Sequence, residues 1–86
     1  MMSIIKVGQM VTVKMGRTLA DGRSDNSYNG EVFEVLAISG NYTVLRRHIT
    51  KYGTPSTDRW SFDMREYSFE QLSDEYIDAL RGPVTQ

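Results

Sequence analysis

The chain has 86 residues, of which 40% are hydrophobic and 24% charged, a composition typical of one ordinary globular domain over residues 1–86. It contains no cysteine and one histidine, so disulfide bonds, cysteine-ligated metal centres and histidine-pair metal sites are excluded. The net charge of −1 provides no global attraction to nucleic acid or to an anionic membrane. Because no run of 18 apolar residues or signal-peptide pattern occurs, we expect a cytoplasmic protein without a membrane span.

Four segments in the first 64 residues have the alternating or β-branched pattern of strands. They are Met10–Met15, Glu31–Ile38, Tyr42–Ile49 and Arg59–Met64. Successive strand residues point to opposite faces, so Arg46 and Arg47 are expected on different sides of the sheet. By the same rule, Trp60, Phe62 and Met64 belong to the core side. In the first strand, the alternation places Val11, Val13 and Met15 together on one face.

Two polar segments separate these strands. Residues 16–29 are rich in Gly, Asp, Ser and Asn, which predicts a long, exposed and mobile loop. Loops of this length in a compact domain are usually functional or disordered. Residues 50–58 form a second loop containing Pro55, which has no N–H group to donate to a sheet.

The C-terminal stretch changes to a helical period. Its apolar residues at helical spacing are Phe69, Leu72, Tyr76 and Leu80. Ser68 and Gln71 match a capping box, and Pro83 would stop the helix. The pattern therefore predicts a helix over residues 69–81 and a tail over residues 82–86.

Together these elements predict a mainly β fold: a small barrel of about five strands over residues 6–67, followed by one C-terminal α-helix. The turns and alternation in residues 7–13, 29–32 and 59–62 are similar to those of a known fold. Over roughly residues 6–72 the chain resembles SH3-like barrels of the KOW and Mind-bomb/HERC2 kind, and the small phage-encoded proteins that use that fold. The resemblance implies an SH3-like barrel and an accessory protein that docks on a host factor, for example one of a defence system.

Charge is divided between the two parts of the chain. Residues 1–60 carry eight basic and five acidic side chains, whereas residues 61–86 carry two basic and six acidic ones. The candidate basic surface consists of Arg17, Arg23, Arg46, Arg47, His48, Lys51 and Arg59. The aromatic candidates among them in sequence are Tyr28, Tyr42 and Tyr52. The helical spacing of Glu70, Asp74 and Asp78 predicts a second, acidic contact surface.

No nucleophile elbow, phosphate loop or dinucleotide fingerprint occurs, so we expect a non-enzymatic binding module without metal or cofactor. The first hypothesis is a protein-binding module that docks on a larger protein and modulates or inhibits it. The second is a module that binds RNA or single-stranded nucleic acid, because cations hold phosphates and tyrosines stack on unpaired bases.

Overall fold

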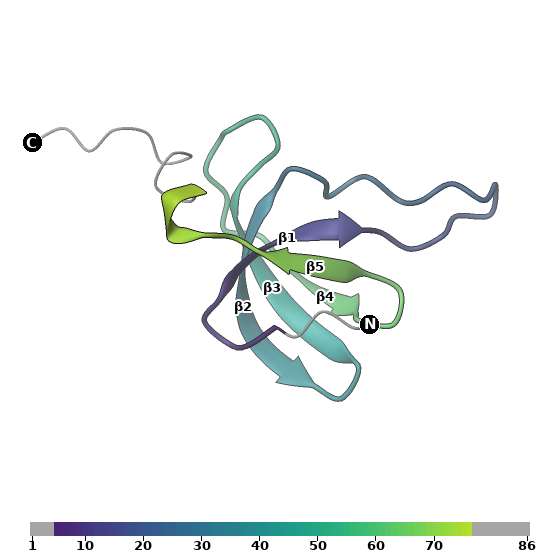
Figure 1. Ribbon diagram of the computed structural model, residues 1–86, viewed down its shortest axis with the longest axis horizontal. Coiled ribbons are helices and arrows are strands. Elements are labelled where there is room, and N and C mark those ends of the chain that lie inside the picture. Colours follow the sequence, from purple (N-terminus) through teal and green to yellow (C-terminus); the bar gives the residue numbers. More distant parts are fainter. Residues whose placement is uncertain (1–4, 77–86) are drawn as a thin grey trace, which may run out of the picture.

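A computed structural model describes residues 5–76 of the chain, and these form one five-stranded antiparallel sheet (Figure 1). The strands are β1 (Met10–Met15), β2 (Val32–Ser39), β3 (Tyr42–Ile49), β4 (Arg59–Asp63) and β5 (Ser68–Gln71). Their order in the sheet is β4-β3-β2-β1-β5. The four strands expected from alternation are confirmed to within one residue at each end, as is the mainly β class.

The sheet curls until its two ends meet, so that β5 passes in front of β4 in Figure 1. The ring centroids of Phe62 on β4 and Phe69 on β5 are 5.8 Å apart. Both rings belong to the same core cluster as Phe33, Val35 and Leu45, which are completely buried. This curl surrounds one small core with side chains from all five strands.

The prediction of a helix over residues 69–81 is wrong for residues 69–73, which are not helical. Ser68–Gln71 is strand β5, paired with β1 through Thr12 opposite Glu70 and Val13 opposite Phe69. Phe69 is 3% exposed, so the burial of its ring and the free edge of β1 outweigh the local preference for a helix. Among the described residues, helical backbone occurs only at 74–76, and residues 77–81 of the predicted helix lie outside the described part.

The expectation that Met15 shares the core face of β1 with Val11 and Val13 is wrong. Val11 and Val13 are buried as expected, but Met15 is 61% exposed. The ladder between β1 and β5 is irregular between Val13 and Met15, which breaks the two-residue alternation. Met15 therefore leaves the core face.

The polar segment after β1 forms a hairpin that projects away from the sheet, at the right of Figure 1. Thr18 pairs with Ser24, and the Leu19 amide donates to the Arg23 carbonyl at 2.7 Å. At its base, a Cβ on Gly16 would lie 1.9 Å from the backbone oxygen of Asp25, which is sterically impossible without a shift. Gly16 thus allows the two arms of the hairpin to approach each other where they leave the sheet.

Candidate binding surfaces

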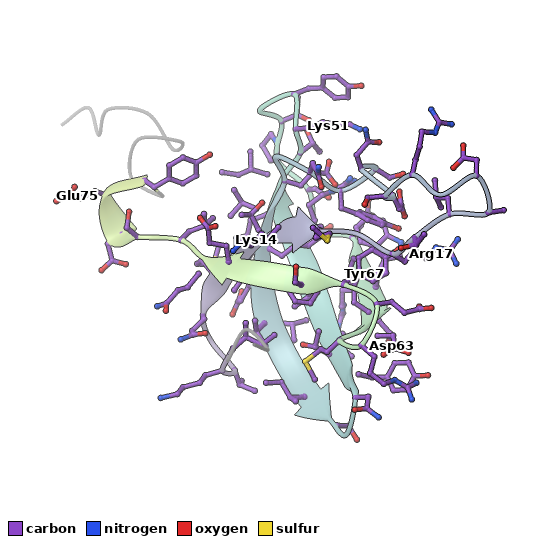
Figure 2. The ribbon with its side chains drawn as sticks, turned by 45° about the vertical axis from the view of Figure 1, so that its right-hand side comes forward. Lys14, Arg17, Lys51, Asp63, Tyr67 and Glu75 are labelled. Atoms are coloured by element: carbon purple, nitrogen blue, oxygen red, sulfur yellow. The ribbon has the colours of Figure 1, made fainter. Side chains whose placement is uncertain are left out.

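The structure distributes the predicted basic residues over several surfaces instead of one. Arg46 and Arg47 lie on opposite faces of β3, as expected from strand alternation. In Figure 2, Arg17 lies at the base of the projecting hairpin, whereas Lys51 lies on the separate loop between β3 and β4. Arg23 is near the hairpin tip, where it forms an ion pair of 2.7 Å with Asp21.

Arg47 is part of a polar network that ties three segments together. Its Nη1 donates to both carboxylate oxygens of Glu31 at 3.1 Å, and its Nη2 donates to Asp58 at 2.8 Å. Its Nε donates to the Ser56 hydroxyl at 2.9 Å. The guanidinium also lies over the ring of Trp60, with Cζ 4.9 Å from the centroid. Every guanidinium nitrogen therefore has a protein partner, so Arg47 is not free to hold a phosphate.

Glu31 is the buried end of this network. It is 2% exposed, and besides Arg47 its carboxylate accepts the backbone N–H of Lys51 at 3.1 Å. Sequence alternation gave no indication of this role, because the partners lie 16 and 20 residues away. Glu31 therefore joins the segment before β2 to β3 through Arg47, and to the β3–β4 loop through the Lys51 amide.

Arg46 and His48 lie on the outer face of the sheet, where both contact Glu34. Arg46 Nη2 donates to Glu34 Oε1 at 2.9 Å, and His48 Nε2 lies 2.8 Å from the same oxygen. The hydrogen bond from His48, followed by that from Arg46, lowers the pKa of Glu34. Glu34 therefore offsets part of the positive charge on this face.

The predicted tyrosines separate into one packed and two exposed side chains. Tyr42 is 51% exposed at the start of β3, and Tyr52 is 84% exposed in the β3–β4 loop. Tyr28 instead packs on the core, with its ring 5.0 Å from Phe62 and 5.6 Å from Trp60.

Tyr28, Trp60 and Tyr67 form a half-buried group that we call the aromatic cluster. Tyr28 and Tyr67 are 6.3 Å apart at their ring centroids, in an edge-to-face arrangement. The three residues come from the projecting segment, from β4 and from the turn before β5. Tyr67 was not among the candidates from sequence, because its neighbours are distant along the chain.

A hydrogen bond fixes the projecting hairpin to this cluster. The Tyr67 hydroxyl donates to Asp25 Oδ2 at 3.0 Å, and Asp25 Oδ1 accepts from the amide and hydroxyl of Ser27. The Ser27 hydroxyl and amide, together with the Tyr67 hydroxyl, lower the pKa of Asp25. Burial, followed by the neighbouring Asp25 carboxylate, raises the pKa of Tyr67 to about 12. Figure 2 shows Arg17 and Tyr67 at this base.

We expect Asp25→Asn to reduce stability at neutral pH and to have little effect in acid. A carboxyl whose folded pKa lies below its unfolded value of 3.8 stabilises the fold above that value, and this contribution is lost as pH falls through the folded pKa. The unfolding free energies of wild type and Asp25→Asn, measured by urea titration between pH 7 and pH 2, should therefore converge below pH 4. A difference that stays constant with pH would contradict this linkage.

The predicted acidic helix face is not formed in the described residues. Glu70 lies on strand β5, opposite Thr12, and Asp74 begins the short helical segment 74–76. Asp78 lies outside the described residues. Because Glu70 belongs to a strand, the i, i+4 relation expected between Glu70 and Asp74 does not apply.

Within residues 5–76, no three His, Asp or Glu side chains come together in a way that could hold a metal ion. In the same part of the chain, no helix has the length and apolar character needed to cross a membrane. Comparison with protein-family models, with curated proteins and with solved structures gives no match to this chain.

Proposed function

We propose that this chain is a non-enzymatic protein-binding module whose main contact surface is the aromatic cluster of Tyr28, Trp60 and Tyr67. The observation that carries this proposal is that three half-buried aromatic side chains from distant segments meet at one place. Tyrosine and tryptophan are the residues that most often dominate protein interfaces, because they bury a large area with few rotatable bonds.

The surroundings of the cluster support a preformed contact surface. The Tyr67–Asp25 hydrogen bond holds one side, and the Arg47 guanidinium over Trp60 holds the other. Side chains held in this way lose little additional freedom when a partner binds. The resemblance to small phage-encoded barrels supports a cytoplasmic host factor as the partner.

Binding of RNA or single-stranded nucleic acid remains the second proposal, and ion pairing makes it the weaker one. Of the seven predicted basic residues, Arg23, Arg46, Arg47 and His48 each contact a carboxylate. A cation already paired in this way contributes less to phosphate binding. Tyr42 and Tyr52 also lie away from the aromatic cluster, so the structure offers no continuous row of stacking platforms among these tyrosines.

The test is capture of a partner from native lysate by the tagged full-length chain, with and without nuclease treatment. We expect one stoichiometric protein to survive nuclease, and Tyr28→Leu to reduce its capture by about tenfold or more. Tyr52→Leu is the matched control, because Tyr52 is 84% exposed and outside the cluster. Emission of Trp60, the single tryptophan, verifies that each variant is folded.

Three results would overturn the proposal. Loss of the partner after nuclease, with recovery of RNA, would favour the nucleic-acid alternative. Equal capture by wild type and folded Tyr28→Leu, or loss of capture only in Tyr52→Leu, would exclude the aromatic cluster as the contact surface.

A further inference from the structure

Two arginines lie directly opposite each other on the outer face of the sheet. Arg46 on β3 is the cross-strand partner of Arg59 on β4. The next pair along the ladder, Arg47 and Asp58, is hydrogen bonded through the Arg47 amide at 2.8 Å. Arg46 and Arg59 therefore form a non-hydrogen-bonded pair, in which side chains approach most closely, with Cβ atoms about 4.5–5.5 Å apart.

The positive charge of this pair is only partly offset. Glu34 Oε1 accepts from Arg46 and also contacts His48, whereas none of the ion pairs within residues 5–76 includes Arg59. The neighbouring Asp58 is committed to Arg47 on the other face. Like charges directly opposite in a sheet are destabilising, so an anion bound between the two guanidiniums would remove a cost present in the free protein.

From this arrangement we infer that the Arg46–Arg59 pair is a second docking surface, which binds carboxylates of an acidic segment in the partner protein. This inference rests on the proposed function as a protein-binding module, but it concerns the face of the sheet opposite to the aromatic cluster. Both guanidiniums come from paired strands, so their backbone positions are fixed before binding.

Carboxylates fit this surface better than a nucleic-acid strand. The aromatic side chains of β4, Trp60 and Phe62, point into the core, and Tyr42 lies four residues from Arg46 at the other end of β3. Within residues 5–76, none of the tyrosine, tryptophan and phenylalanine rings named above adjoins the arginine pair, and only the His48 imidazole lies against it, 3.3 Å from Arg46 Nη2. Single-stranded nucleic acids depend on stacking for much of their affinity, so a row of bases finds little support here.

The test is a titration of the full-length, isotope-labelled chain, followed by NMR. The probe is a blocked hexaglutamate peptide, with hexaglutamine and hexauridylate as comparisons. We expect saturable amide shifts centred on Arg46 and Arg59, and no such shifts with hexaglutamine. Arg59→Gln should weaken hexaglutamate binding by about tenfold or more, as expected for loss of a charge-assisted contact.

Arg23→Gln is the matched control, because it removes the same charge from an 81% exposed side chain already paired with Asp21. Equal weakening by both substitutions, shifts scattered over all basic residues, or no binding would overturn the inference. Tighter binding of hexauridylate at the same residues would replace it with a nucleic-acid site. None of these outcomes alters the Tyr28→Leu test, so failure here is distinguishable from failure of the proposed function.

Discussion

Replacing Arg47 by alanine should lower the free energy of unfolding by about 3–5 kcal/mol, the cost of leaving a buried charge without its partner. The Glu31 side chain is 3% exposed and receives two hydrogen bonds from Arg47. Without Arg47, the Glu31 carboxylate would keep only the Lys51 amide as a donor. Because a domain of this length has a total stability of about 4–13 kcal/mol, the variant should be close to unfolding at 37 °C.

Arg46→Ala provides the matched control, since Arg46 is the next residue on β3 and also forms an ion pair. Its side chain is 40% exposed and that of Glu34 is 27% exposed, so this pair should contribute about 0–1 kcal/mol. The measurement is chemical denaturation of both variants, followed by Trp60 emission. A loss in Arg47→Ala no larger than that in Arg46→Ala would show that the buried network is not required.

The double variant Glu31→Gln with Arg47→Met separates the two possible causes of the loss. If the uncompensated charge of Glu31 is the cause, the double variant should be more stable than Arg47→Met alone, because Glu31→Gln removes the charge that Arg47→Met leaves without a partner. If the loss comes instead from packing of the Arg47 stem on Trp60, Glu31→Gln should add nothing to Arg47→Met.

Phe33→Ala should have a comparable effect, with an expected loss of about 3–5 kcal/mol. Phe33 on β2 is completely buried, and its ring contacts Tyr28, Trp60 and Phe62 at centroid distances of 6.2, 6.3 and 5.7 Å. A cavity at this position would remove the support beneath the aromatic cluster. The variant should therefore lose partner capture as well as stability.

Tyr52→Ala is the control for this prediction. Its side chain is 84% exposed, so the free energy of unfolding should change by no more than about 0.5 kcal/mol. Denaturation midpoints and near-ultraviolet circular dichroism report on both variants. A Phe33→Ala protein with wild-type stability would mean that the neighbouring rings do not form a tightly packed core.

Strand positions could be predicted because their determinants are local. Alternation in Arg59–Asp63 places Trp60 and Phe62 on one face whatever strand lies beside them, and the same rule separates Arg46 from Arg47. Strand β5 could not be predicted in this way. Ser68 and Phe69 fit a helix start equally well, and the strand is favoured only by tertiary contacts: the edge of β1 and the burial of the Phe69 ring.

The sequence by itself determined the mainly β class, four of the five strands, and the face of the sheet on which most of their side chains lie. These features depend on a two-residue period. Tertiary structure alone decided the sites. Tyr67 meets Asp25 across 42 residues, and Arg47 reaches Glu31 across 16. The tertiary structure also decided which basic side chains form ion pairs with carboxylates, since these ion pairs depend on the register between strands. The physical reason is that periodicity specifies which face a side chain occupies, whereas packing of distant segments specifies its neighbours.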